Sequence, residues 1–89
     1  MKIHEGSEAG KALLLWLRQF RDKNPESPTG FQPLHLYLVA VGFSPEGAKE
    51  RSRNLRMWLV LEGVLKDQPS LCKGRYFDDF LSILEEVHS

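Results

Sequence analysis

The fold is decided by the stretch Pro33 to Phe77, which reads PLHLYLVAVGFSPEGAKERSRNLRMWLVLEGVLKDQPSLCKGRYF. An apolar segment, Leu34 to Val41, opens this stretch, and a longer amphipathic segment runs from about Pro45 to Glu62. A short turn that contains glycine and serine separates the two segments. The spacing predicts two helices that meet at a tight turn.

The residues of the turn support this interpretation. Gly42 can adopt the positive φ that ends the first helix, Ser44 can cap the second, and Pro45 fits its first turn, where no amide hydrogen is needed. The first segment is apolar on all sides, which indicates either a deeply buried helix or a strand. Its end, Val39 to Val41, favours a strand when taken alone. For Leu34 to Val41, helix and strand therefore both stand as alternatives.

The residues after the second helix predict a small hairpin. Gly63 is followed by Val64 to Lys66, by a polar reversal from Asp67 to Ser70 that contains a proline, and by Leu71 to Phe77. Residues of this kind favour a turn, so the two flanking runs are expected to form short strands around it. The result would be a β-wing beside a pair of helices.

This combination resembles the winged helix-turn-helix superfamily. The resemblance covers Leu34 to Phe77 and rests on a helix end that reads LVLEGVL, residues 59–65, followed by a hairpin that closes on Gly74, Arg75 and Tyr76. It implies a DNA-binding regulator in which the second helix of the pair enters the major groove. It also implies dimerisation through the flanking helices, as winged-helix regulators often show.

One further helix is expected on each side of this stretch. The first runs from about Glu8 to Lys23, and the last begins near Phe77. Both carry apolar residues at positions i, i+3, i+4 and i+7. The last helix ends in acidic residues, which are unfavourable there and predict fraying after Leu84. The two apolar sets are Leu13, Trp16, Leu17 and Phe20, and Phe77, Phe80, Leu81 and Leu84.

Together these expectations define a mainly α (α+β) fold with three to four helices, a helix-turn-helix and a small two-stranded β-wing. Eighty-nine residues leave room for one core of ordinary size, so residues 1–89 are expected to form a single domain. Residues 1–6 and about 86–89 are expected to be loose ends. A hydrophobic content of 42% is typical of a folded globule.

Charge is balanced over the whole chain but unevenly placed along it. The formal net charge is zero, which argues against binding nucleic acid through bulk electrostatics alone. Residues 44–75 carry seven Lys and Arg against four Asp and Glu, whereas residues 76–89 carry four acidic residues and no Lys or Arg. A positive face can therefore exist on this neutral protein.

The strongest functional signal is a basic set on the longer helix of the pair. Arginine can bind guanine edges or phosphates, asparagine can pair with adenine, and an exposed helix fits the major groove. We expect Arg53 and Asn54 to lie nearest the bases, with the other cations on phosphates. The candidate DNA-binding residues are Lys49, Arg51, Arg53, Asn54, Arg56, Lys73 and Arg75. The alternative is a solvated or protein-binding face on which Glu46 and Glu50 pair with neighbouring cations.

The sequence offers no catalytic constellation, and we expect neither an enzyme nor a bound cofactor or metal. The single cysteine, Cys72, excludes an internal disulfide and a cysteine-based zinc site. No two histidines have the spacing of metal ligands. No apolar run approaches the roughly 20 residues that span a bilayer, and no signal-peptide core is visible. An intracellular, cytoplasmic protein is therefore expected.

Apolar residues that remain after the core is assigned suggest a contact with another protein. The residues that would form such a patch if exposed, for a homodimer or a partner, are Leu14, Leu15, Met57 and Val60. The leading hypothesis is a small, dimeric regulator of transcription that binds double-stranded DNA. The alternative is a non-enzymatic protein-protein interaction module, acting as an adaptor, subunit or inhibitor. A third alternative is a structural subunit of a larger assembly.

Overall fold

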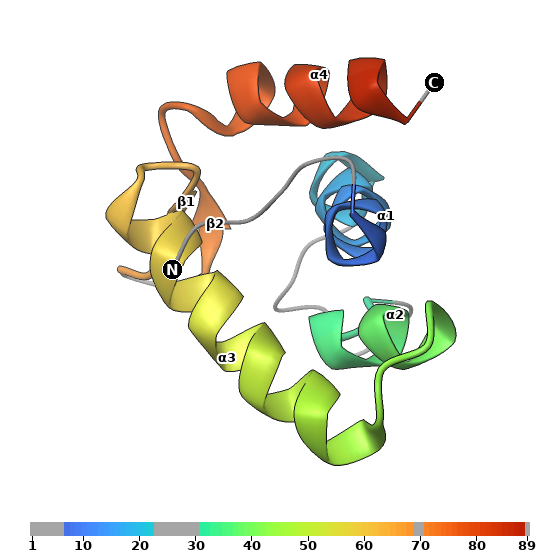
Figure 1. Cartoon of the computed structure of the whole chain (residues 1–89). Coiled ribbons are helices and arrows are strands. Elements are labelled where there is room, and N and C mark those ends of the chain that lie inside the picture. Colours follow the sequence, from blue (N-terminus) through green and yellow to red (C-terminus); the bar gives the residue numbers. More distant parts are fainter. Residues whose placement is uncertain (1–6, 23–30, 69–70, 89) are drawn as a thin grey trace.

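The computed structural model consists of four helices and one short hairpin within the residues that it describes, which are 7–22, 31–68 and 71–88 (Figure 1). The elements are α1 (Glu8–Asp22), α2 (Leu34–Ala40), α3 (Pro45–Leu61), β1 (Leu65–Lys66), β2 (Cys72–Lys73) and α4 (Phe77–Val87). The predicted fold class, mainly helical with a small two-stranded sheet, is confirmed. The predicted loose end at residues 1–6 lies outside the described residues. No helix of the described part has the length and apolar character needed to cross a membrane.

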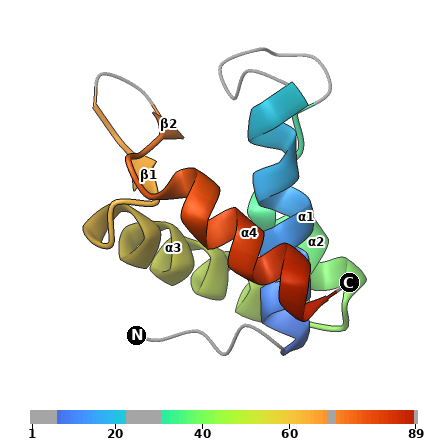
Figure 2. The same cartoon turned by 90° about the horizontal axis from the view of Figure 1, so that it is seen from above.

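Helix α1 lies at the centre of the core, where it packs against both α2 and α4 (Figures 1 and 2). The apolar set predicted for it is buried in full: Leu13, Trp16, Leu17 and Phe20. The ring of Phe20 lies 5.1 Å from that of Trp16, 5.1 Å from that of Phe31 and 5.8 Å from that of Phe77, measured between ring centres. Because Phe31 precedes α2 and Phe77 begins α4, this aromatic cluster joins three separate segments of the chain.

The segment of uncertain type, residues 34–41, is a helix and not a strand. Helix α2 occupies Leu34–Ala40 and packs against α1 and α3. Of its seven residues, Leu34 and Leu38 are buried. Leu36 is exposed, so the expectation that this apolar helix is buried on all sides is wrong. One side of α2 faces away from both helices that it contacts.

Helix α3 begins where the sequence predicts. Its first residue is Pro45, and the Oγ of Ser44 accepts a hydrogen bond from the N–H of Gly47 at 3.1 Å. Gly42 has a φ of +114°, a conformation that side chains disfavour, and this lets the chain turn from α2 into α3. The helix ends at Leu61, one residue earlier than predicted.

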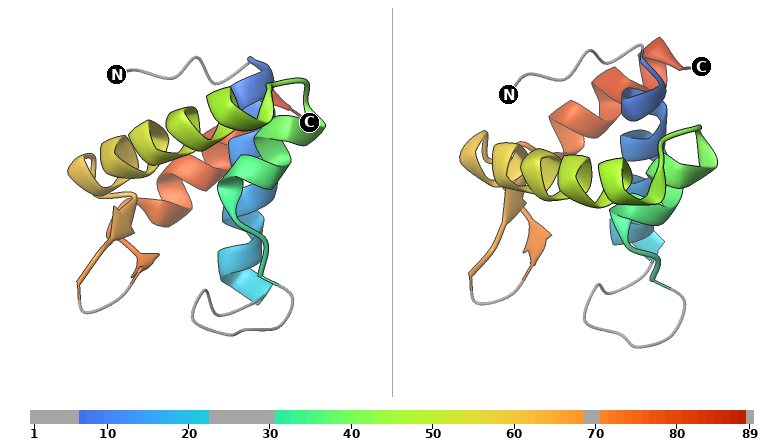
Figure 3. Two further views of the ribbon diagram at one scale, coloured as in Figure 1. Left: turned by 90° about the horizontal axis from the view of Figure 1, so that it is seen from below. Right: turned by 60° about the horizontal axis from the view of Figure 1, so that its bottom comes forward.

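The predicted wing is an antiparallel hairpin that projects from the end of α3 (Figure 3). Its strands are shorter than predicted, because only residues 65–66 and 72–73 pair. The base of the hairpin depends on two glycines: Gly63 has a φ of +81°, and Gly74 lies so close to the Gly63 carbonyl that a Cβ atom would overlap it. The N–H of Tyr76 donates to the same carbonyl at 3.0 Å. This close approach fixes where the hairpin leaves α3.

Helix α4 continues to Val87, although fraying was predicted after Leu84. Residues 86 and 87, which were expected to belong to a loose end at 86–89, are therefore helical. In its last turn the Oε2 of Glu85 lies 3.3 Å from Nη2 of Arg18 and 3.5 Å from Nη2 of Arg21. Each ion pair of this exposed kind contributes about 0–1 kcal/mol. The two arginines of α1 thus compensate the negative charge that was expected to end the helix.

Gln19 joins α1 to the segment before α2. Its side chain is buried, its Nε2 donates to the carbonyl of Gln32 at 3.0 Å, and its Oε1 accepts the N–H of Gln32 at 2.8 Å. Both contacts are to the backbone of Gln32, whose own side chain takes no part in them. This pair of bonds sets the spacing between α1 and the start of α2.

Replacing Gln19 by Met should lower the free energy of unfolding by about 1–3 kcal/mol, because the bulk is kept while both backbone groups of Gln32 lose their partner. The matched control is Gln32→Met, which leaves the backbone groups in place and should change stability by no more than about 0.5 kcal/mol. Urea unfolding followed by circular dichroism measures both variants. Equal losses would contradict the role given to Gln19.

Two glycine variants should separate steric overlap from backbone strain. Gly74→Ala should cost roughly 1–3 kcal/mol because its Cβ has no room beside the Gly63 carbonyl. Gly42→Ala meets no atom within 4 Å but forces a side chain to accept a positive φ, at a cost of about 1–3 kcal/mol. Amide chemical shifts of the hairpin should move in Gly74→Ala and stay in place in Gly42→Ala. Unmoved hairpin shifts in the first variant would show that the two glycines do not hold the hairpin.

Candidate functional site

The side of α3 that faces away from the core is the candidate site. Ala48, Leu55 and Leu59 are buried and share one side of the helix. Since an α-helix turns by about 100° per residue, the opposite side can be read from the sequence. We call this opposite side the crest of α3; its residues, all of them exposed, are Glu46, Glu50, Arg53, Met57 and Leu61.

Three exposed cations lie on one flank of α3, and one of them, Arg53, also belongs to the crest. They are Lys49, Arg53 and Arg56, at positions i, i+4 and i+7. Within the described residues none of these three side chains forms an ion pair or a hydrogen bond. The pairing with Glu46 and Glu50 that was weighed as an alternative is therefore not formed. Both guanidinium groups of this flank remain without a compensating carboxylate in the described part of the chain.

Arg51 and Asn54 lie on the other flank of α3. Arg51 comes five residues before Arg56, which places it about 140° around the helix. Its guanidinium carbon lies 4.8 Å from the centre of the Phe43 ring. With Gly47 these residues line a separate hollow of about 290 Å³. The predicted DNA-binding set therefore does not form one continuous surface.

The two predicted cations of the hairpin each lie over an aromatic ring of the same chain. The Nζ of Lys73 is 5.3 Å from the centre of the Phe77 ring, and the guanidinium carbon of Arg75 is 4.9 Å from that of Tyr76. Such contacts contribute about 0.5–1 kcal/mol at exposed sites. Arg75 also borders a hollow of about 460 Å³ together with Lys66, at the base of the hairpin.

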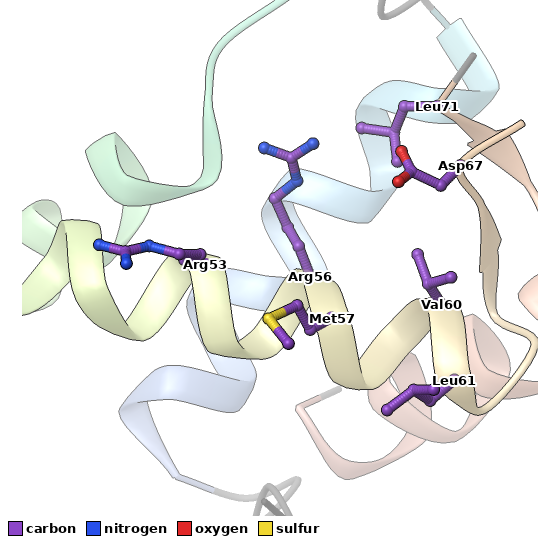
Figure 4. A pocket seen from close by; sticks show the side chains of 7 residues that line it. All are labelled: Arg53, Arg56, Met57, Val60, Leu61, Asp67 and Leu71. Carbon is purple, nitrogen blue, oxygen red and sulfur yellow. The ribbon is translucent and has the colours of Figure 1, made fainter. Parts of the chain in front are cut away.

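A groove of about 390 Å³ lies between α3 and the loop of the hairpin (Figure 4). Arg56 and Val60 project from α3 on the side where Asp67 and Leu71 lie, and Met57 faces outward beside them. Its lining combines apolar side chains with two arginines and one aspartate. We call this hollow the α3 groove; its lining residues are Arg53, Arg56, Met57, Val60, Leu61, Asp67 and Leu71.

The apolar part of the α3 groove is unusually open to solvent. Met57 is 59% exposed and Leu61 is 83% exposed. Met57 and Val60 are residues that the sequence predicts for a partner contact, whereas Leu61, Leu71 and Asp67 are not among the predicted residues. The i, i+4 spacing of Met57 and Leu61 was available as a signal for Leu61. The position of the two hairpin residues depends on the path of the backbone and has no comparable signal.

The four residues predicted to contact a partner do not form one patch. Leu14 is 4% exposed because α1 packs against both α2 and α4, so its predicted place in an exposed patch is wrong. Leu15 is exposed on α1. Met57 and Val60 belong to the α3 groove, on a helix that packs against α2 and β1.

Among residues 7–22, 31–68 and 71–88, no three His, Cys, Asp or Glu side chains gather in a way that could hold a metal ion. Cys72 is a half-buried free thiol. The α3 groove presents two guanidinium groups, one carboxylate and four apolar side chains.

Comparison of this chain with protein-family models, with curated proteins and with solved structures found no match. The resemblance to winged helix-turn-helix proteins therefore stays a prediction.

Two arginines on opposite flanks of α3 should respond to neutralisation with opposite signs. Arg53→Gln should leave stability unchanged or raise it by about 0.2–0.5 kcal/mol, because Lys49 and Arg56 repel it across one turn. Arg51→Gln should lower stability by about 0.5–1 kcal/mol, because its contact with Phe43 is lost. Urea unfolding at low salt measures the difference between the two variants, and a loss of equal size in both would show that Arg53 has a partner.

Proposed function

We propose that this protein is a non-enzymatic protein-protein interaction module, an adaptor, subunit or inhibitor, which binds its partner through the α3 groove. The observation that carries the proposal is the exposure of Met57 and Leu61 on a helix crest beside an open groove. Contiguous exposed apolar surface of this kind is typical of contacts with other proteins. Arg53 and Arg56 line the same groove and would supply the polar residues that usually surround such an apolar contact.

The crest of α3 favours a protein partner over DNA. A recognition helix presents its crest to the floor of the major groove and to the neighbouring phosphates. Here the crest carries two exposed carboxylates, Glu46 and Glu50, and only one cation, Arg53. Its other residues, Met57 and Leu61, are apolar. Carboxylates repel phosphates, and the apolar side chains offer DNA only the contact with thymine methyl groups.

A second candidate function, a DNA-binding regulator of transcription built like a winged helix-turn-helix protein, is favoured by a specific observation. The side chains of Lys49, Arg53 and Arg56 have no ion-pair partner within the described residues. Lys66 and Arg75 at the base of the hairpin would extend this positive flank. Either function would be exercised inside the cell, in the cytoplasm.

Site-specific photo-crosslinking tests the proposed function. A photoreactive phenylalanine derivative in place of Met57 should form a covalent adduct with a protein in the cells that make this chain. The same residue in place of Leu36 is the matched control, because Leu36 is an exposed apolar residue on α2, outside the α3 groove. Protein adducts at position 57 and none at position 36 support the proposal. Equal adducts at both positions, or nucleic acid at position 57, would refute it.

Titration with random duplex DNA tests the second candidate. If the positive flank of α3 binds phosphates, affinity should fall steeply with salt, and Arg53→Glu with Arg56→Glu should flatten that dependence by about two phosphate contacts. Arg18→Glu, on the far helix α1, is the control and should keep the slope. Affinity that does not change with the α3 variants would remove DNA from consideration.

A further inference from the structure

Helix α3 presents a stripe of one cation followed by two apolar side chains. Arg53, Met57 and Leu61 stand at positions i, i+4 and i+8, and all three are exposed and line the α3 groove. Residues at this spacing lie on one side of a helix, over a length of about 12 Å. We call these three residues the α3 stripe.

Helix α4 presents a stripe of the same spacing and the opposite charge. Asp79, Ile83 and Val87 stand at positions i, i+4 and i+8; Asp79 is exposed, Ile83 is 48% exposed and Val87 is 50% exposed. The buried residues of this helix, which occupy another side, are Phe77, Leu81 and Leu84. We call the exposed three residues the α4 stripe.

We propose that the occupant of the α3 groove is α4 of a second copy of this chain. With the two helices parallel, Arg53 faces Asp79, and the two apolar residues of one stripe face the two of the other. An antiparallel arrangement would instead place each charge against an apolar residue. This inference rests on the proposed protein-interaction function and names the partner of the same groove.

The two stripes are kept apart within one chain. Arg53 and Asp79 form no ion pair in the described part of the structure. Helix α4 is packed against α1, and its Glu85 is engaged by Arg18 and Arg21. The complementary surfaces can therefore meet only between copies, and each copy supplies one stripe of each kind.

A helix suits the groove better than an added strand. Strand addition needs a sheet edge with a row of free backbone groups, and here each strand has two residues. The apolar residues that α3 contributes to the groove instead form a row along the helix axis, because Met57, Val60 and Leu61 lie at i, i+3 and i+4. Such a row accepts the side chains of a helix laid along it.

Sedimentation equilibrium of two charge-reversed variants, alone and mixed, tests the proposal. Arg53→Asp and Asp79→Arg should each weaken self-association of the protein about tenfold, because reversal replaces an attraction by a repulsion. An equimolar mixture should restore association. In the mixed dimer there are two contacts between α3 and α4. At one contact the new carboxylate of the Arg53→Asp variant faces the new guanidinium group of the Asp79→Arg variant. At the other contact the native Arg53 of the second variant faces the native Asp79 of the first. No other pairing of residues predicts recovery on mixing two variants that fail alone.

Asp78→Arg is the matched control for Asp79→Arg. Both aspartates lie in the first turn of α4 and are exposed, but Asp78 lies about 100° around the helix from the α4 stripe. This control should associate like the wild type, and circular dichroism should show all variants folded.

A wild type that stays monomeric, or a mixture that does not recover, overturns the proposal. If position 57 nevertheless crosslinks another protein, the interaction function stands; if it crosslinks nucleic acid, both proposals fail.

Discussion

The burial of α1 between α2 and α4 is the constraint on which the rest of the structure depends. Helix α3 packs against α2 and β1 and contributes Ala48, Leu55 and Leu59 to the core. Near its C-terminal end the rings of Trp58 and Phe80 lie 5.6 Å apart. The aromatic contacts around Phe20 reinforce this order, since each edge-to-face pair adds about 0.5–1.5 kcal/mol beyond its burial. Helix α3 is thus supported along one side, and its crest and both flanks remain open.

The hairpin turns this open helix into a groove. Val64 and Leu65 are buried, so the start of the hairpin is anchored in the core, and the meeting of Gly63 and Gly74 sets the direction in which it leaves. Asp67 and Leu71 are thereby placed beside the last turns of α3, where they line the α3 groove together with Val60. The candidate site and the fold are linked at these two glycines, because their close approach sets where the hairpin lies beside α3.

Much of the fold could be predicted from local patterns. The i, i+4 spacing of α1 and α4, the turn at Gly42 and the cap at Ser44 are local signals, and each is found where it was expected. The burial of Leu14 could not be predicted, because it depends on α1 being covered from two sides. The separation of Arg51 from Arg56 around α3 follows from helical periodicity alone. The bonds from Gln19 to the backbone of Gln32 left no pattern in the sequence.

The positions of the helices determine which charged residues lie close enough to interact. A chain with zero net charge and a negative tail could neutralise its own basic segment, and that would remove any reason for a partner. The structure directs the tail elsewhere: Glu85 meets the arginines of α1, and the buried side of α4 holds Asp79 on the outside of the molecule. Exposed charges of opposite sign therefore stay apart on one molecule, where water and salt screen them. In the proposed contact between two copies, Arg53 of one copy would meet Asp79 of the other, which brings these separated charges together.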